Sequence, residues 1–137
     1  CEMETTAAPR VSISILVVED EAITLEFLVT TLARKFADVT LHKALNGRMG
    51  LDLFKTHTHD IVITDINMPD MGGAQMAGQI HAIKPDTKFI VLTGDSEKLT
   101  LKDSAGNAFE IDHYIVKPVF FNELFASVEQ CIKSIHR

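Results

Sequence analysis

Short runs of apolar and β-branched residues alternate along this chain with longer segments in which apolar residues recur every three or four positions. A continuous run of four to six such residues is typical of a strand that is buried on both faces. Runs of this kind predict five strands, at 13–18, 39–44, 61–64, 89–92 and 113–116. The second run carries His42 and Lys43, so we expect it at an edge of the sheet.

Segments with helical periodicity follow each run. They predict five helices, at 22–36, 48–56, 74–83, 96–105 and 122–135. The fourth has the weakest pattern, because Leu99 and Leu101 are its only large apolar residues and Gly106 follows it. Strands and helices in alternation predict an α/β fold of three layers, a parallel sheet with helices on both faces. A polar second strand at one edge fits the flavodoxin-like order 2-1-3-4-5.

Length and composition limit the classes of protein. A chain of 137 residues favours one domain, which we place at 13–137, with 1–12 as a linker or expression remnant. The net charge of −6 argues against direct nucleic-acid binding. No apolar run is long enough to span a bilayer, so no membrane partner is expected. Two distant cysteines and no signal peptide indicate a reducing, cytoplasmic location.

Polar residues stand where the strong strands end. The carboxyl ends of parallel strands lie along one edge of a sheet, where open α/β sheets bind ligands. We therefore expect a shared site from five residues: Glu19, Asp20, Asp65, Thr93 and Lys117. Each has an ordinary alternative as a helix-start acid, a turn residue or a solvated lysine. Their joint placement favours the shared site.

The carboxylates of this site predict a magnesium ion. Three carboxylates without a cation would repel one another, and Mg²⁺ prefers oxygen ligands while keeping several waters. We expect Asp20 and Asp65 as direct ligands, Glu19 as a ligand through water, and the backbone carbonyl of Asn67 as a further oxygen. The five together would bind a phosphoryl group, which the carboxylate of Asp65 would accept.

Four motifs carry a resemblance to a known family: Val17-Val18-Glu19-Asp20-Glu21, Asp65-Ile66-Asn67-Met68-Pro69, Thr93-Gly94 and Tyr114-Ile115-Val116-Lys117-Pro118. Residues 13–135 resemble the receiver domain of two-component response regulators. The resemblance implies that Asp65 is the phosphoacceptor, that Glu19 and Asp20 bind Mg²⁺, and that Lys117 contacts the phosphoryl group. It also implies a cis bond between Lys117 and Pro118.

Further roles follow from the resemblance alone. Thr93 and Tyr114 match the pair that moves inward on phosphorylation, and Asn67 and Asp95 match positions that tune dephosphorylation. The donor would be a histidine kinase or a histidine phosphotransfer domain. The protein would be no enzyme beyond catalysing its own phosphotransfer and autodephosphorylation. Its signal would leave through the surface of the fourth helix, fifth strand and fifth helix, which is also the surface for an optional homodimer.

Two departures and several alternatives stand beside this interpretation. The interval from Thr93 to Lys117 is about two residues longer than in many receivers, and 106–112 is an unusual segment. The runner-up is a pseudo-receiver, an interaction module that signals without phosphate. A dehalogenase-like phosphatase expects an acid where Asn67 stands, and a flavin carrier expects more Trp and Tyr. His57 and His59 could bind a transition metal, but surface histidines are favoured.

Overall fold

The computed structural model of the chain describes residues 13–66, 71–94, 101–102, 106 and 108–135. Residues 1–12, which we expected to be a linker or expression remnant, lie outside this part. The described elements, in chain order, are β1 (Ser14–Val18), α1 (Ala22–Lys35), β2 (Thr40–Ala44), α2 (Gly47–His57), β3 (Ile61–Asp65), α3 (Gly73–Ile83), β4 (Lys88–Thr93), β5 (Leu101–Lys102), β6 (Ala108–Phe109), β7 (His113–Val116) and α4 (Phe121–Ile135).

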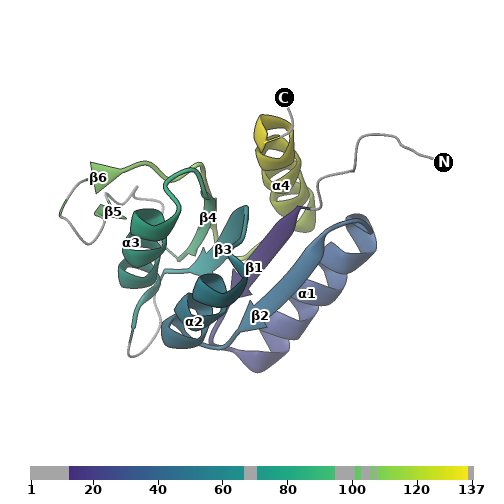
Figure 1. Cartoon of the computed structure of the whole chain (residues 1–137). Coiled ribbons are helices and arrows are strands. Elements are labelled where there is room, and N and C mark those ends of the chain that lie inside the picture. The colour runs from purple at the N-terminus through teal and green to yellow at the C-terminus, as the bar shows by residue number, and fades with distance from the viewer. Residues whose placement is uncertain (1–12, 67–70, 95–100, 103–105, 107, 136–137) are drawn as a thin grey trace.

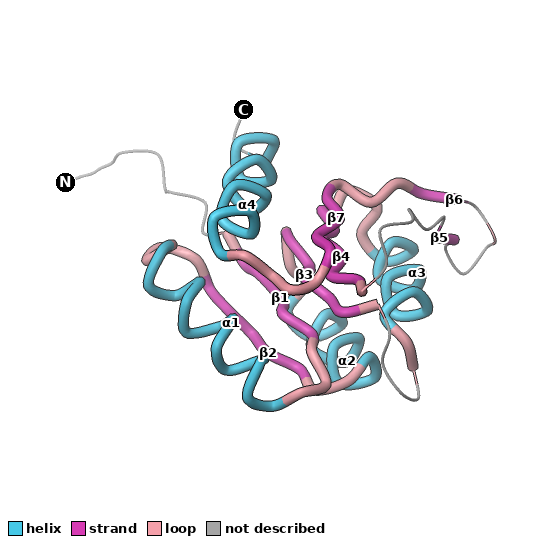
Figure 2. Tube along the Cα trace, turned by 180° about the vertical axis from the view of Figure 1, so that it is seen from behind, coloured by secondary structure: helices cyan, strands magenta, loops and turns pink. Residues whose placement is uncertain are grey.

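Five of these strands form one parallel sheet in the order β2-β1-β3-β4-β7. With β7 as the fifth predicted strand, this is the expected order 2-1-3-4-5, and β2 lies at an edge as its polar residues predicted. Figures 1 and 2 show the strands side by side, with α1 and α2 flanking the β2 edge. The predicted fold class is confirmed.

The two faces of the sheet bury alternate residues of each strand, because side chains along a strand point to opposite sides. One face packs against α1 and α4, and the other against α2 and α3. The first core contains Val17, Ile63, Leu92, Leu28 and Val128, among others. The second contains Leu16, Val62, Val91, Phe54 and Met76, among others. Three layers therefore rest on the uninterrupted apolar strands seen in the sequence.

The prediction of a helix at 96–105 is wrong at Leu101 and Lys102, the two residues of this range that the structure describes. Leu101 and Lys102 form β5, which pairs antiparallel with β6 in a separate two-stranded sheet. Between these strands Gly106 has a φ of +87°, a left-handed conformation that glycine adopts without strain. The few apolar residues of this segment give no helical face to bury, so pairing between strands prevails. The rest of the predicted helix, 96–100 and 103–105, lies outside the described residues.

Local signals account for the remaining elements. The side chain of Asn46 caps α2 by accepting a hydrogen bond of 2.8 Å from the backbone N–H of Met49. The observed strands agree with the predicted runs to within a residue or so at each end. Among the helices described, none combines the length and the apolar character needed to cross a bilayer.

Candidate functional site

The five predicted site residues meet at the carboxyl edge of the sheet. Glu19 and Asp20 follow β1, Asp65 ends β3, Thr93 ends β4 and Lys117 follows β7. Backbone hydrogen bonds hold these strand ends together: the N–H of Ile66 donates to Leu92 at 3.1 Å, and that of Lys117 donates to Thr93 at 2.7 Å. The predicted convergence of residues from four separate strands is therefore observed.

Three carboxylates form an acidic cluster at this edge. Glu19, Asp20 and Asp65 each offer an oxygen, and these oxygens lie within 4.8 Å of one another. Glu19 and Asp65 are buried, whereas Asp20 is exposed. One oxygen of Glu19, Oε2, accepts the backbone N–H of Glu21 at 3.1 Å. Its other oxygen, Oε1, is buried and has no hydrogen-bond partner among the described residues.

The electrostatics of Glu19 make the cluster receptive to a cation. Burial raises the pKa of Glu19, and the nearby charge of Asp65 raises it further. The N–H of Glu21 and the ammonium of Lys117 act in the opposite direction but do not cancel the effect of burial. A buried carboxylate with an unsatisfied oxygen beside a second carboxylate is therefore stabilised by any positive charge that enters.

The ammonium of Lys117 already supplies one such charge. Its Nζ donates a hydrogen bond of 2.7 Å to Oδ2 of Asp65 and lies 3.7 Å from Oε1 of Glu19. Partial burial works to lower the pKa of Lys117, but the hydrogen bond to Asp65 and both carboxylate charges raise it above its usual value. The Lys117–Pro118 bond is cis, as the resemblance implied. Lys117 is therefore a fixed cation facing Asp65.

The donor set fits Mg²⁺. All three side chains offer carboxylate oxygens, the ligands that this hard cation prefers, and the exposure of Asp20 leaves room for the waters that Mg²⁺ retains. Oε1 of Glu19 favours a cation most directly, because it is buried, accepts no hydrogen bond from the described residues and has the Lys117 ammonium only at 3.7 Å. Asn67, whose carbonyl we expected as a further ligand, lies outside the described residues.

The predicted switch residues are placed but their roles stay predictions. Thr93 is buried at the end of β4, beside Lys117. Tyr114 is half-buried in β7, opposite Val91 of β4, and packs against the core on the α2 and α3 side. Asp95, expected with Asn67 to tune dephosphorylation, also lies outside the described residues.

The backbone around Asp65 has supports that our sequence analysis did not identify. The hydroxyl of Thr64 donates to the backbone carbonyl of Asp65 at 2.8 Å. The backbone N–H of Gly73 donates to the backbone carbonyl of Ile66 at 3.2 Å. A Cβ at Gly73 would lie 2.2 Å from the carbonyl oxygen of Asp65. The pair Gly72-Gly73 after the strand was the available signal, because two glycines permit such a close approach.

The expectation that His57 and His59 are surface histidines is wrong for His59. His57 is exposed, but His59 is fully buried and its Nε2 lies 2.8 Å from Nδ1 of His42. His59 stands directly before the buried strand β3 and beside Phe54, which brings its ring into the core. In the described part, the acidic cluster is the only group of three or more His, Cys, Asp or Glu side chains whose ligand atoms all lie close enough to hold one metal ion.

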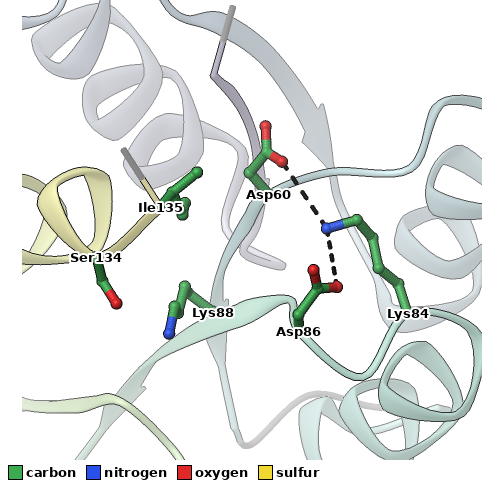
Figure 3. A pocket seen from close by; sticks show the side chains of 6 residues that line it. All are labelled: Asp60, Lys84, Asp86, Lys88, Ser134 and Ile135. Carbon is green, nitrogen blue, oxygen red and sulfur yellow. Dashed lines mark ion pairs between the residues drawn. The ribbon is translucent and has the colours of Figure 1, made fainter. Parts of the chain in front are cut away.

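A separate cavity of about 340 Å³ lies at the opposite, amino-terminal edge of the sheet (Figure 3). It is lined by Asp60, Lys84, Asp86, Lys88, Ser134 and Ile135. Lys84 pairs with Asp86 at 3.2 Å and with Asp60 at 3.8 Å, and Lys88 lies 3.9 Å from Asp112. Its lysines are thus paired within the protein, and it lies away from the acidic cluster.

Comparison with known proteins agrees with this geometry. Residues 15–129 match the family model described as the response regulator receiver domain. The chain is 29% identical to the cell cycle transcriptional regulator CtrA of Caulobacter vibrioides, over 87% of its own length and 50% of that protein. It is 30% identical to the uncharacterized transcriptional regulatory protein YesN of Bacillus subtilis, over 90% of its length and 33% of that protein.

Solved structures give the same result for the fold. The response regulator protein TrrA of Thermotoga maritima, in complex with Mg(2+)-BeF, is 34% identical and has a TM-score of 0.73. That comparison covers 87% of this chain and 98% of the TrrA chain. By contrast, the chain spans only a third to about a half of the curated relatives CtrA and YesN.

Proposed function

The chain belongs to the response regulator receiver family, and we propose that it is a phosphorylation-controlled signalling switch that accepts a phosphoryl group on Asp65. One observation carries the proposal. The buried carboxylate of Asp65 lies 2.7 Å from the ammonium of Lys117 and shares a cluster with the carboxylates of Glu19 and Asp20. That set fits Mg²⁺, and the similar protein TrrA was solved in complex with Mg(2+)-BeF.

The transfer itself is an in-line displacement at phosphorus. A carboxylate oxygen of Asp65 forms the new P–O bond while the P–N bond of a phosphohistidine breaks, and the donor imidazole leaves with the electron pair. When bound at Glu19, Asp20 and Asp65, Mg²⁺ would supply positive charge to the phosphoryl oxygens. Lys117 supplies further positive charge from its fixed position, and the hydroxyl of Thr93 supplies a hydrogen-bond donor.

The donor we propose is a histidine kinase or a histidine phosphotransfer domain. Apolar side chains exposed beside the site support a protein donor. Ile23 and Phe27 in α1 are 86% and 61% exposed, and Phe120, just before α4, is 61% exposed. Phe27 meets Phe121 edge to face, with ring centroids 5.1 Å apart, so the two helices present one apolar surface. A surface of this kind favours contact with another protein.

The phosphoryl group would act through a change of surface. We propose that Thr93 and Tyr114 respond to it and that the change spreads to β7 and α4, the counterparts of the expected fifth strand and fifth helix. The expected fourth helix has a different counterpart here, because the described residues between β4 and β7 include the short strands β5 and β6 and no helix. A homodimer through this surface stays a prediction.

The wider setting is also a proposal. We place the switch in the cytoplasm and assign it no catalysis beyond its own phosphotransfer and autodephosphorylation. CtrA and YesN are named as transcriptional regulators, but the net charge of −6 favours no direct contact with nucleic acid by this chain. The pseudo-receiver alternative is not favoured, since the acidic cluster and its lysine are intact.

Phosphorylation with a small donor tests the proposal. The protein is incubated with acetyl phosphate and Mg²⁺, and its intact mass is measured. We expect the mass of one phosphoryl group to be added, and we expect Asp65→Asn to abolish the addition. Asp60→Asn is the matched control, because Asp60 precedes β3 at the other edge of the sheet and should leave the reaction unchanged. An unmodified parent protein, or a modified Asp65→Asn variant, would show the proposal to be wrong.

A further inference from the structure

Three histidines from separate segments meet at the corner formed by β2 and α2. His42 lies in β2, His57 ends α2, and His59 lies in the loop that enters β3. The rings of His42 and His57 are stacked, with centroids 4.4 Å apart, and the ring of His59 meets that of His42 nearly at a right angle. Nothing in the proposed phosphorylation uses this cluster.

The hydrogen bond inside the cluster requires a neutral acceptor. Nδ1 of His42 and Nε2 of His59 lie 2.8 Å apart, so one imidazole donates its N–H and the other accepts it. If both rings were protonated, both nitrogens would carry a proton and the bond would be lost. His59 is fully buried, and its other nitrogen, Nδ1, has no hydrogen-bond partner among the described residues. The closed cluster therefore cannot hold His42 and His59 both in their charged forms.

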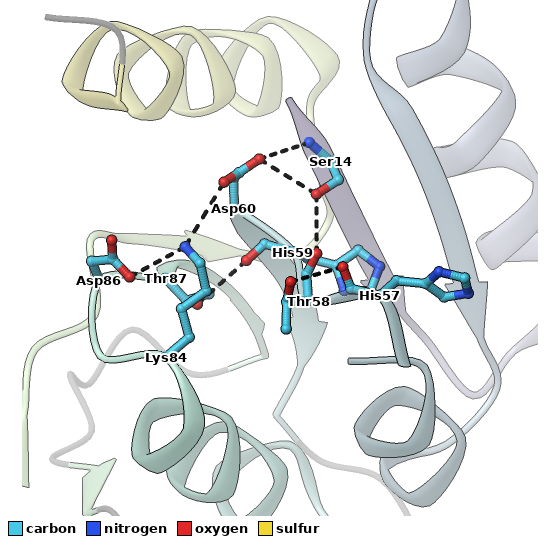
Figure 4. A network of polar contacts seen from close by, with 8 residues as sticks. All are labelled: Ser14, His57, Thr58, His59, Asp60, Lys84, Asp86 and Thr87. Carbon is cyan, nitrogen blue, oxygen red and sulfur yellow. Dashed lines mark hydrogen bonds and ion pairs between the residues drawn. The ribbon is translucent and has the colours of Figure 1, made fainter. Parts of the chain in front are cut away.

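The segment that carries His59 is fixed on both sides (Figure 4). The carboxylate of Asp60 accepts the backbone N–H of Ser14 at 3.0 Å, and the hydroxyl of Thr87 donates to the carbonyl of His59 at 3.4 Å. By contrast, β2 is an edge strand that pairs only with β1. If both rings became charged, they would therefore separate by movement of β2 and α2, not by movement of His59.

Other charges near the cluster do not offset a proton on His59. Asp60 is the one acid that favours the charged form of His59, whereas His42 and His57 oppose it. The neighbouring Lys43 of β2 pairs with Glu26 of α1. Lys55 of α2 is exposed. Burial and the two neighbouring imidazoles lower the pKa of His59 to about 4.

We propose that His42, His57 and His59 form an acid-sensitive latch: below about pH 6 the closed form of the β2–α2 corner loses stability and the corner opens more often, while the rest of the sheet stays paired. The latch closes again when the rings lose their protons. Its opening would reach the acidic cluster through the backbone, because the carbonyl of Ala44 at the end of β2 accepts the N–H of Glu19 at 3.1 Å. This last consequence rests on the proposed function, but the latch itself does not.

Amide hydrogen exchange at pH 7.5 and pH 5.5, expressed as protection factors, tests the latch without Mg²⁺ or a phosphoryl donor. If His59 has its ordinary pKa in the open corner, protection in β2 and α2 should fall about tenfold between these pH values. Protection in β3 and β4 should change far less. An equal loss throughout the sheet would overturn the proposal.

Two variants sharpen the test. His59→Phe removes the titrating ring beside Phe54 and should abolish the acid response in β2 and α2. His113→Phe, in β7 at the opposite edge of the sheet, should keep the acid response in β2 and α2. A histidine NMR titration of the unmodified protein gives an answer even if His59→Phe does not fold. A folded-state pKa of 6 or above for His59 would refute the latch, and so would an unchanged response in a folded His59→Phe.

Discussion

Gly73 lies against the main chain of the proposed acceptor, so Gly73→Ala should disturb both stability and phosphorylation. A Cβ built there would lie 2.2 Å from the carbonyl oxygen of Asp65 and 2.9 Å from Cα of Ile66. Both are backbone atoms at the end of β3, and neither can rotate away. The start of α3 must therefore move relative to β3, or the end of β3 must move relative to the sheet.

The size of the effect follows from these distances. Atoms of this kind normally approach to about 3.5 Å, so the methyl group requires a shift of about 1 Å. Forcing an extra carbon into a packed site costs about 1–3 kcal/mol. A displacement of about 1 Å at a reacting group can slow a reaction about 100-fold. We therefore expect Gly73→Ala to lose stability in this range and to accept phosphoryl groups about 100 times more slowly.

Gly50→Ala is the matched control. A Cβ at Gly50, in α2, would lie 2.8 Å from Sδ of Met76 and 3.0 Å from a methyl group of Val18, which are side-chain atoms. The flexible end of Met76 can move, and alanine is favoured over glycine in a helix by about 1 kcal/mol. We expect a change in unfolding free energy within about 1 kcal/mol and an unchanged rate of phosphorylation.

Urea unfolding and the initial rate of phosphorylation by acetyl phosphate measure both quantities for the two variants. The rate is compared under conditions in which each variant is folded. Equal urea midpoints for Gly73→Ala and Gly50→Ala, together with equal phosphorylation rates, would refute the claim that the backbone contact to Asp65 positions the acceptor.

Three further predictions concern the acidic cluster, the core and pH. Glu19→Gln should weaken Mg²⁺ binding about 10- to 100-fold, measured by calorimetry, because it removes a carboxylate that supports the ion. An unchanged affinity would exclude Glu19 from the site. Phe54→Ala should lower the unfolding free energy by about 3–5 kcal/mol in urea, since its ring is fully buried; a loss under 1 kcal/mol would contradict this packing. The pKa of His59 is lowered to about 4, so the unfolded chain binds the extra proton and stability falls as pH drops from about 6.5 to 4. The loss should be about 3 kcal/mol and absent from His59→Phe, and an equal loss in both would assign it to other groups.

The sequence alone determined the sheet and the composition of its carboxyl edge. Alternation between buried strands and periodic helices depends on local burial, which a one-dimensional pattern records directly. Once the strands are parallel, their carboxyl ends must share an edge, so Glu19, Asp65, Thr93 and Lys117 could be placed together without coordinates. The cis bond before Pro118 and the roles of Thr93 and Tyr114 came from the resemblance to a family, and the structure supports the first of these.

Tertiary contacts decided the features that local patterns could not record. Leu101 and Lys102, expected in a helix, form β5 and pair with β6, where Phe109 stacks on His81 of α3 with ring centroids 4.1 Å apart and also contacts Phe89. That contact joins three segments distant in the sequence. The same reason explains His59, whose burial depends on His42 and Phe54. Hydrophobic periodicity fixes which face of an element is buried, but only the folded chain decides which side chains from other elements meet it there.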